Sequence, residues 1–325
     1  RGSARLCRAP SMIGFVVNRM LFAVAVLFGV VTVTFVLMHL AGDPLAGLIP
    51  PGAAPEVEQQ IRQRYGLDRP LPEQYVDFVG RAMRGDFGES WRQGRPALAA
   101  VLERLPATVA LAGVATVLAV LIGGFLGVTS AARPGSPWDA GARLTALLGQ
   151  AIPAFWLGTM LILLFAVELD WLPSSGMPGP AGVILPALAL AAYPAATLTR
   201  LLRAAMIETL GADYIRTARA KGLSRRRILL GHALRNAALP ALAFTGLQAG
   251  FLLGGAVIVE GVFAYPGIGG LALDAVAARD IPLVEAFVWV VAILILAANT
   301  LTGIIAAWLD PRLREPATVL GGATP

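Results

Sequence analysis

Long apolar stretches alternate with short polar connectors along almost the whole chain. About six of these stretches approach the roughly 20 residues that a helix needs to cross the hydrocarbon core of a membrane. This pattern predicts an all-α polytopic membrane protein with about six transmembrane helices. The predicted spans are Met12–Leu40, Thr108–Ala132, Leu144–Val167, Ile184–Ala205, Ala238–Phe263 and Leu283–Leu309.

The fourth predicted span contains two prolines, Pro186 and Pro194. A proline inside a helix removes a hydrogen bond and bends the helix, but neighbouring helices in a membrane bundle tolerate this. We therefore keep the stretch as the fourth candidate span.

Three arginines, Arg1, Arg5 and Arg8, precede the first apolar stretch, as in the basic start of a secretory signal peptide. The apolar part of a signal peptide usually has about 7–15 residues. Here the apolar run from Leu21 to Leu40 has about 20 residues, which is long enough to cross a membrane. We expect it to belong to an uncleaved first transmembrane helix at residues 12–40, preceded by a short segment at residues 1–11.

Composition agrees with a membrane location. Only 14% of the residues are charged and the mean hydropathy is +0.71, whereas soluble domains have about 25% charged residues. The net charge of +6 is segregated from the apolar runs, so nucleic-acid binding explains it poorly. The single Cys7 permits no internal disulfide, and the only histidines, His39 and His232, lie too far apart in sequence to predict a metal site.

Arginines are concentrated in the connector between the second and third spans, in that between the fourth and fifth, and after the last span. They include Arg133, Arg143, those within residues 200–235, Arg312 and Arg314. The alternate connectors, Glu168–Val183 and Ala264–Pro282, contain only Arg279. Because basic connectors favour the cytoplasm, both termini, residues 1–11 and 311–325, are expected on the cytoplasmic side.

Residues 41–106 form a long segment after the first span and are expected outside the cytoplasm, since long loops cross the membrane largely regardless of their charge. Apolar residues recur at helical spacing in Pro55–Tyr65 and Pro72–Met83. These patterns predict short helices at the outer face. The alternative is a solvated connector without a role of its own.

A basic loop at residues 206–236 separates the fourth and fifth spans and shows the start and stop signals of two short helices. Asp213 is a candidate N-cap of the first helix, Gly222 suits the left-handed position after its end, and Ser224 is a candidate N-cap of the second. Tyr214, Ile215 and Ala218 should share one face of the first helix. Small residues at 220 and 222 would let another surface approach, which favours a docking element. The alternative is an amphipathic helix whose arginines contact anionic lipid headgroups.

Two phrases of this loop, Ala218–Leu223 (ARAKGL) and Arg235–Pro240 (RNAALP), resemble the cytoplasmic coupling loop of binding-protein-dependent ABC importer permeases. Arg216 and Thr217 stand where many of these permeases have Glu–Ala, and Gly222 is about one helical turn farther from Leu239–Pro240 than in sugar permeases. Both differences are typical of the dipeptide and oligopeptide branch.

Further phrases resemble the B-type permease subunit of that branch, and the resemblance extends from Ile13 to Arg314. These phrases are Ala41–Pro44, Tyr65–Asp68 with Pro70–Leu71, Gly85–Ser90, Pro153–Gly158, Glu260–Phe263 with Tyr265–Gly269, and Asp310–Arg312. The resemblance implies a permease core at residues 107–310 and a loop that seats in a cleft of an ATPase subunit. The coupling residues that it implies are Tyr214, Ile215, Thr217, Ala218, Arg219, Ala220, Lys221, Gly222 and Leu223.

The same resemblance implies a bacterial inner-membrane importer of dipeptides or oligopeptides that works by alternating access. Its partners would be a homologous second permease, two cytosolic ATPase subunits, an extracytoplasmic substrate-binding protein and membrane lipid, with no nucleic acid. Permeases for nickel chelates or glutathione would show the same pattern. An ion-coupled secondary transporter is the alternative from another class, although the acidic residues here lie near span ends, as at Glu168, Asp170, Glu208 and Glu260.

The chain lacks the phosphate-binding loop of an ATPase, whose glycines, lysine and Ser/Thr cradle phosphates. The only lysine, Lys221, follows Ala220 and precedes Gly222, outside any such motif. We therefore expect a non-enzymatic subunit without a cofactor, and expect ATP and Mg²⁺ to bind partner subunits. We also find no nucleophile with a base, paired aspartates or zinc-protease motif that would favour an intramembrane enzyme.

In the fifth span Gly246, Gly250 and Gly254 recur at every fourth position, which predicts a helix-packing seam, the alternative being glycines without a partner. Candidates for a substrate path are Gln248, Glu260, Phe155, Trp156 and Tyr265. Glu260 would bind the ammonium group of a peptide or, equally, pair with Arg279. Gln248 would face water or join two helices, and the three aromatic residues would line the path or serve as lipid-interface anchors and packing.

Overall fold

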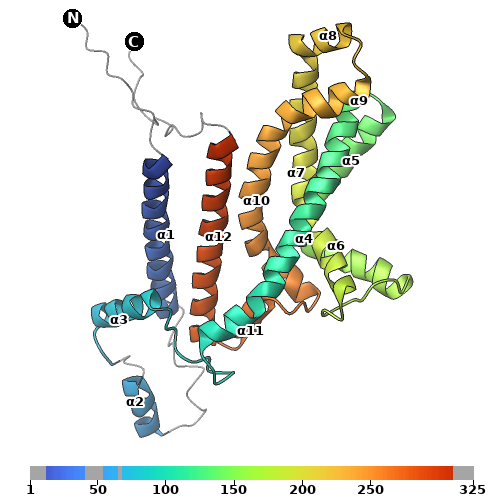
Figure 1. The fold of residues 1–325 in the computed structure, drawn as a ribbon. Coiled ribbons are helices and arrows are strands. Elements are labelled where there is room, and N and C mark those ends of the chain that lie inside the picture. The colour runs from blue at the N-terminus through green and yellow to red at the C-terminus, as the bar shows by residue number, and fades with distance from the viewer. Residues whose placement is uncertain (1–11, 41–53, 65–67, 310–325) are drawn as a thin grey trace, which may run out of the picture.

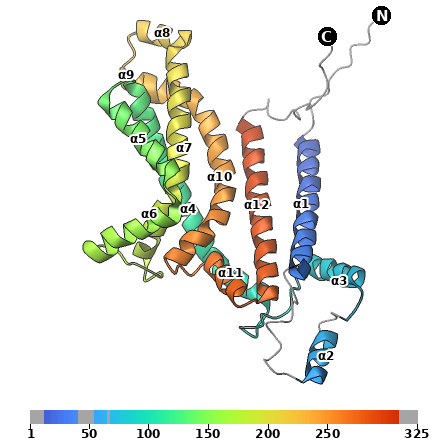
Figure 2. The same ribbon diagram turned by 180° about the vertical axis from the view of Figure 1, so that it is seen from behind.

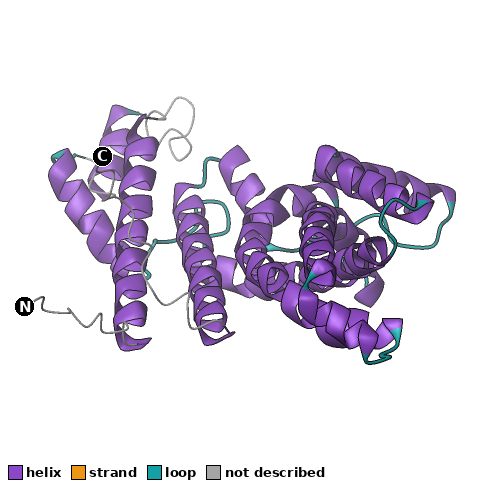
Figure 3. Cartoon of the chain, turned by 90° about the horizontal axis from the view of Figure 1, so that it is seen from above, coloured by secondary structure: helices purple, strands orange, loops and turns teal. Residues whose placement is uncertain are grey.

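The computed structural model describes residues 12–40, 54–64 and 68–309. Its regular structure in these ranges is helical, and Figure 3 shows helices and loops but no strand there. The elements are α1 (Met12–Leu40), α2 (Pro55–Arg64), α3 (Leu71–Met83), α4 (Ala97–Ala132), α5 (Pro137–Ala151), α6 (Ala154–Leu161), the π-helix η1 (Ile162–Glu168), the 3₁₀-helix η2 (Pro180–Val183), α7 (Ile184–Gly211), α8 (Asp213–Ala220), α9 (Arg225–Arg227), the π-helix η3 (Ile228–Ala233), α10 (Leu234–Val262), α11 (Ile268–Ala277) and α12 (Ile281–Leu309) (Figure 1).

The described residues contain four single helices that are long and apolar enough to cross a membrane, in α1, α4, α7 with η2, and α12. Two bent helix pairs raise the number of candidate spans to six, Pro137–Ala151 with Ala154–Glu168 and Arg225–Gln248 with Gly250–Val262. The polytopic all-α fold predicted from the apolar stretches is therefore confirmed.

The third predicted span, Leu144–Val167, is not one straight helix. The chain bends by 108° between α5 and the helical run Ala154–Glu168. Ile152 has extended backbone angles (φ −81°, ψ 122°) and is followed by Pro153. A proline disfavours helical geometry in the residue before it and has no amide to donate, so the helix ends there. The apolar pattern continues across the break, which explains why hydropathy alone predicted a single span.

The second predicted span begins earlier than expected. Helix α4 starts at Ala97 rather than Thr108 and continues through Pro106. The predicted outer segment, residues 41–106, therefore ends inside a membrane helix. Its two short helices are present as α2 and α3, and α11, inside the connector Ala264–Pro282, was not predicted. Residues 41–53 and the predicted tails, 1–11 and 311–325, lie outside the described residues.

Helices α1, α12, α10 and α7 stand side by side in that order, α5 lies beyond α7, and α4 runs obliquely from the foot of α12 to α5 (Figures 1 and 2). Helix α7 lies between α4 and α5 on one side and α10 on the other, and glycines of α4 and α5 pack directly on it. A Cβ at Gly123 of α4 would lie 2.7 Å from Ala195 O, and one at Gly149 of α5 would lie 3.1 Å from Ala192 O. Small residues thus bring these backbones together, as is usual between membrane helices.

The bundle has two distinct ends. Helix α8 lies at one end, where α1 begins and α12 ends, and α2, α3 and α11 lie at the other (Figures 1 and 2). We call these the α8 end and the α11 end. This arrangement places the basic loop of the sequence and the described part of its predicted outer segment, including α2 and α3, on opposite sides of the spans.

Candidate functional site

Helix α8 follows α7 after a single residue, Ala212, which occupies the N-cap position in extended geometry (φ −69°, ψ 150°). Asp213 is the first helical residue and makes no side-chain cap bond, so its predicted role as N-cap is wrong. Its carboxylate still lies in the first turn, where the helix dipole favours a negative charge.

Helix α8 ends in the geometry that its glycine predicted. Gly222 has a φ of +77°. The Leu223 amide donates to Ala218 O at 3.3 Å and the Gly222 amide donates to Arg219 O at 2.9 Å. These two bonds form a Schellman motif, which satisfies the last carbonyl groups and turns the chain toward α9.

The second short helix predicted in this loop does not stand apart from the fifth span. Ser224 takes the N-cap position of α9, but its side chain makes no cap bond. No loop separates α9, η3 and α10, and the helical run that starts at Arg225 bends only between Gln248 and Gly250. The basic residues predicted as a separate element therefore begin the fifth span itself.

An apolar seat holds α8 against the rest of the chain. Ile215 is fully buried and Ala218 nearly so, and both join a cluster that includes Met206 of α7. Ile228 and Ala233 complete the cluster from η3. Burying apolar side chains at about 25 cal/mol per Å² makes this contact the main force that holds α8 in place. The cluster therefore packs α8 against both the fourth and the fifth spans.

Tyr214 does not share the buried face of Ile215 and Ala218 as predicted. It remains 44% exposed, and its hydroxyl oxygen accepts a hydrogen bond of 2.8 Å from Asn236 Nδ2. The physical reason is helix geometry, since the residue before a buried position points about 100° away from it. Tyr214 thus links α8 to the start of α10 at the surface.

The outward face of α8 is exposed and basic. Besides Asp213 and Tyr214, the exposed residues here are Arg216, Thr217, Arg219, Ala220 and Lys221. The one acid of the helix, Asp213, lies 3.4 Å from Arg216 Nη1 in an exposed pair of the kind that contributes little to stability. This surface combines fixed positive charge with small side chains, and a larger acidic surface could approach it closely.

A buried carboxylate fixes the spans beneath α8. Asp139 of α5 is 1% exposed and accepts bonds from Arg203 Nε at 2.7 Å and from Arg203 Nη2 at 2.9 Å. The Gly135 amide (2.9 Å) and the Ser130 hydroxyl donate to the same carboxylate. These bonds tie the end of α4 and the start of α5 to α7, so α8 is attached to a braced helix.

Polar side chains form a chain of hydrogen bonds along the apolar surface between α5 and α7. Gln150 Nε2 donates to Thr197 Oγ1 at 2.8 Å, and Arg200 Nη1 donates to Gln150 Oε1 at 2.6 Å. Together with Arg143 and Arg203 they line a cavity of about 760 Å³. Charged and amide groups within membrane spans normally face a water-filled space or the bundle interior rather than lipid.

The sequence reasoning missed this polar face. Its signal was the spacing of Tyr193, Thr197 and Arg200, which lie one helical turn apart inside an otherwise apolar span. Tyr193 is 53% exposed and Arg200 is exposed, so the face is open in the single chain.

Glu260, a predicted path residue, is fully buried in this conformation. Its carboxylate accepts bonds from Thr108 Oγ1 at 2.6 Å, from the Gly269 amide at 2.7 Å and from the Gly270 amide at 3.2 Å. The predicted alternative, an ion pair with Arg279, is not what the structure shows, because these donors occupy the carboxylate. Glu260 thus joins α10 to α4 and to the first turn of α11.

The other predicted path residues do not meet at one place. Tyr265 is 2% exposed and packs in the central core, and burial, together with the charge of Glu260, raises the pKa of its phenol. Phe155 and Trp156 are 50% and 47% exposed on α6, which extends away from the bundle in Figure 1. Gln248 is half-buried on α10.

The glycines of α10 differ in their surroundings. A Cβ at Gly246 would collide with Thr302 of α12, and one at Gly250 would lie 3.3 Å from Asn299 Oδ1. The structure therefore has a close helix contact at these two positions. Gly254 differs from the predicted seam because no atom lies within 4 Å of its Cβ position.

Among the described residues, no group of three or more His, Cys, Asp or Glu side chains is placed to hold a metal ion.

Comparison with known families identifies the class of this chain. Residues 102–315 match the family described as the inner membrane component of binding-protein-dependent transport systems, and residues 12–112 match its N-terminal counterpart. The chain belongs to this family. The resemblance first inferred from the coupling-loop phrases is thereby confirmed.

Curated members of this family match the chain along nearly all of its length. The oligopeptide transport system permease protein AppB of Bacillus subtilis is 38% identical, over 93% of this chain and 99% of the relative. The di/tripeptide transport system permease protein DppB of Pseudomonas aeruginosa is 37% identical, over 94% and 99%. The glutathione transport system permease protein GsiC of Escherichia coli is 38% identical, over 93% and 99%.

Two solved structures share the fold of about two thirds of this chain. Two structures of inward-facing conformations of the MetNI methionine ABC transporter match with TM-scores of 0.51 and 0.53. They cover 66% and 65% of this chain, and 95% and 96% of the matched chains, at 17% identity. Together with the family match and the full-length relatives, the chain is a multi-pass membrane permease component of a transport system.

Proposed function

We propose that this chain is the transmembrane subunit of an ATP-driven importer of dipeptides and oligopeptides in a bacterial inner membrane. The names of the full-length relatives AppB and DppB support the substrate class. The structural observation that supports the mechanism concerns α8. This exposed basic helix packs on the apolar seat between α7 and η3.

In this proposal the exposed face of α8 docks onto a separate ATPase. The coupling residues Tyr214, Thr217, Arg219, Ala220 and Lys221 are exposed, whereas Ile215 and Ala218 hold the helix to its seat. Gly222 and Leu223 close the helix. When the ATPase subunits approach each other on binding ATP, α8 moves with them and tilts the fourth and fifth spans, which changes the side from which the path is open.

The complete importer would contain a homologous second permease, two cytosolic ATPase subunits that bind ATP and Mg²⁺, and an extracytoplasmic substrate-binding protein. The α8 end would face the cytoplasm. The start of the first span and the end of the last span would lie on that side. The permease itself would need no cofactor. Basic connectors at this end support that orientation.

We assign the substrate path to the polar face of α5 and α7 around Gln150, Thr197 and Arg200. These side chains supply hydrogen-bond donors and a positive charge that suit the backbone and carboxylate of a peptide. Glu260, Gln248, Phe155, Trp156 and Tyr265 would reach the path only in another conformation, because in this one they are buried or lie apart from that face.

The transport proposal is tested by uptake of a labelled dipeptide into vesicles that contain the assembled importer with its binding protein outside. Uptake should require enclosed ATP and should persist without any ion gradient. Uptake driven by an ion gradient without ATP would instead indicate a secondary transporter. Competition by unlabelled glutathione tests the second candidate substrate, which the match to GsiC favours.

The docking proposal is tested by Ala220→Trp, which enlarges the exposed face of α8 without touching its seat. The variant should assemble in the membrane, lose co-purification with the ATPase and lose most ATP-dependent uptake. Met83→Trp is the matched control, because Met83 is 77% exposed at the α11 end and lies away from α8. Full ATPase binding and uptake by Ala220→Trp would refute docking at α8.

The path assignment is tested by Arg200→Gln, which removes a charge from the polar face and keeps a hydrogen-bonding group. Peptide uptake should fall about tenfold while ATPase binding is unchanged, since a charge-assisted bond is worth more than 1 kcal/mol. Arg84→Gln, an exposed arginine at the other end, is the control. Unchanged uptake in Arg200→Gln would remove this face from the path.

A further inference from the structure

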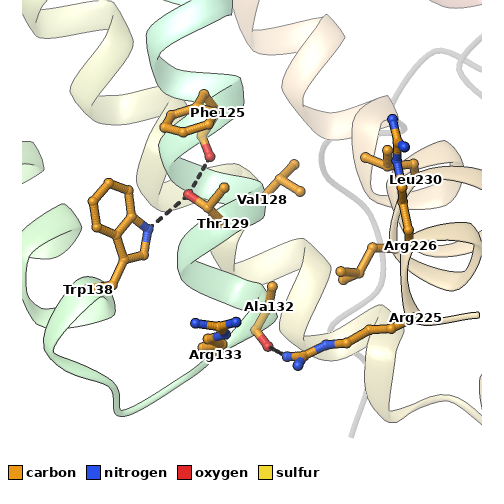
Figure 4. Close-up of a pocket in the computed structure, with 10 residues that line it drawn as sticks. Phe125, Val128, Thr129, Ala132, Arg133, Trp138, Arg225, Arg226 and Leu230 are labelled. Carbon is orange, nitrogen blue, oxygen red and sulfur yellow. Dashed lines mark hydrogen bonds between the residues drawn. The ribbon is translucent and has the colours of Figure 1, made fainter.

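A second cavity lies at the α8 end, between the last turns of α4, the start of α5 and the helical run α9–η3. Its volume is about 650 Å³ (Figure 4). It lies apart from the polar face of α5 and α7, because the two cavities share no lining residue. Neither the coupling of α8 nor the proposed peptide path uses it.

One part of this cavity is apolar. Phe125, Val128, Leu229 and Leu230 line it, and Phe125 and Leu230 are 60% and 48% exposed. Trp138 of α5 forms the remaining wall and meets the ring of Phe125 edge to face, with centroids 6.3 Å apart. These side chains leave apolar surface uncovered, and an acyl chain could cover it.

The other part of the cavity is basic. Figure 4 shows Arg133 and Arg225 at the end of α4 beside Ala132, while Phe125 lies two turns back along the same helix. Arg226 also lines the cavity. None of these three arginines forms an ion pair with an acid within the described part of the chain. No acid of the described residues therefore neutralises their positive charge.

Hydrogen bonds hold this arrangement in place. Arg225 Nη2 donates to Ala132 O, the last carbonyl of α4, which leaves the other donors of its guanidinium available. Trp138 Nε1 donates to Thr129 Oγ1 at 3.0 Å, and that hydroxyl donates to Phe125 O at 2.6 Å. A half-exposed tryptophan whose ring packs on another aromatic ring and whose N–H is satisfied is typical of the membrane interface.

We propose that this cavity binds an anionic diacyl phospholipid of the cytoplasmic leaflet, such as phosphatidylglycerol. Arg133 and Arg225 would bind the phosphate, and the wall formed by Phe125, Val128 and Leu230 would hold acyl chains. Basic pockets at the cytoplasmic ends of membrane helices suit such headgroups. The inference rests on the proposed orientation of the α8 end and is independent of the peptide substrate. A bound lipid would join α4 to the base of the fifth span and would affect how far that span tilts.

The test uses the assembled importer in nanodiscs made from equal parts of phosphatidylglycerol and phosphatidylcholine, followed by native mass spectrometry. The wild-type complex should retain phosphatidylglycerol in preference to phosphatidylcholine. Each arginine lost in Arg133→Gln/Arg225→Gln should weaken that retention about fivefold. The control Arg84→Gln/Arg92→Gln removes the same charge from the α11 end and should leave retention unchanged.

A second variant, Leu230→Trp, fills the apolar part without changing charge and should also reduce retention. Photoactivatable phosphatidylglycerol should label peptides of α4 and η3 in the wild type but not in this variant. Equal retention of both lipids, unchanged retention in the variants, or displacement by soluble glycerol phosphate alone would overturn the proposal. So would a cross-link from Leu230→Cys to the second permease or to the ATPase, because a protein would then cover the cavity.

Discussion

The two ends of the bundle use different means to hold their backbones. At the α11 end, buried carboxylates accept bonds from amides of other segments. Asp280 is 1% exposed and accepts from the amides of Trp91 (3.2 Å) and Arg92 (3.3 Å) as well as from the Ser90 hydroxyl. At the α8 end, apolar side chains hold α8, and its polar residues remain exposed.

The difference matters because the two kinds of contact respond differently to force. A carboxylate bonded to several amides has one favourable geometry, and losing it leaves buried donors unsatisfied. An apolar seat is non-directional, so a helix can shift on it at lower cost. We infer that the α11 end keeps its shape while the α8 end transmits movement.

Beneath the apolar seat, the α8 end also has a buried ion pair between Asp139 and Arg203. Replacing Arg203 by Met should cost about 3–5 kcal/mol, because it leaves the buried Asp139 carboxylate without its main partner. Thermal unfolding of the purified complex measures this loss. Arg143→Met is the control and should cost less than about 1 kcal/mol, since Arg143 Nε lies 3.8 Å from Asp139 and the side chain is 57% exposed. Equal losses would show that the brace does not depend on Arg203.

The rigidity of the α11 end is tested at Glu260. Glu260→Ala should cost about 3 kcal/mol, because Thr108 and the amides of Gly269 and Gly270 lose their acceptor. Glu260→Gln keeps one acceptor oxygen and should cost less. Glu208→Ala, at an exposed glutamate of α7, should stay within about 0.5 kcal/mol. If all three variants unfold at the wild-type temperature, Glu260 does not hold the α11 end together.

The end of α8 is tested at Gly222. Gly222→Ala meets no neighbouring atom within 4 Å but must adopt a φ of +77°, so it should cost about 1–2 kcal/mol and should loosen α8. Gly211→Ala also has open space but needs no positive φ, so it should be neutral or slightly stabilising. Unfolding and ATP-dependent uptake should both distinguish the two. A harmless Gly222→Ala would mean that the closure of α8 is not required.

The smallest expected difference in stability is between variants of two serines at N-cap positions. Ser136 accepts a bond of 3.2 Å from the Asp139 amide, so Ser136→Ala should cost about 1 kcal/mol. Ser224 makes no cap bond, so Ser224→Ala should cost less than about 0.5 kcal/mol. Comparing the unfolding of both variants measures how much capping contributes beside the apolar seat. The reverse order would contradict the hydrogen bonds described.

Much of the fold follows from hydropathy because the length of an apolar stretch determines whether it can span a membrane. The first and last spans begin within two residues of the predicted positions, at Met12 and Ile281. Hydropathy does not predict where a helix ends within an apolar stretch. Pro153 ends a helix in apolar sequence, whereas Pro106 is accommodated inside α4, and both have the same effect on a hydropathy average.

The candidate site could be predicted only in part. The phrase around Gly222 indicated α8 and its end, because a short helix closed by a left-handed glycine is a local feature of the sequence. It did not separate the exposed residues of α8 from the buried Ile215 and Ala218, and it placed Tyr214 on the wrong face. The partners of Glu260 could not be predicted, since Thr108 lies 152 residues away in sequence. The polar face of Gln150 and Thr197 likewise depends on how α5 packs against α7, which hydropathy does not specify.

The central claim, that α8 meets a separate ATPase in the cytoplasm, is most directly tested at Lys221, the only lysine of the chain. Inside-out vesicles with the assembled importer are treated with a short, membrane-impermeant cross-linker between amines, and the products are identified by mass spectrometry. The account predicts a product that joins Lys221 to the ATPase subunit and disappears in Lys221→Arg. Modification of Lys221 only in right-side-out vesicles, or its modification in inside-out vesicles without any link to the ATPase, would contradict it.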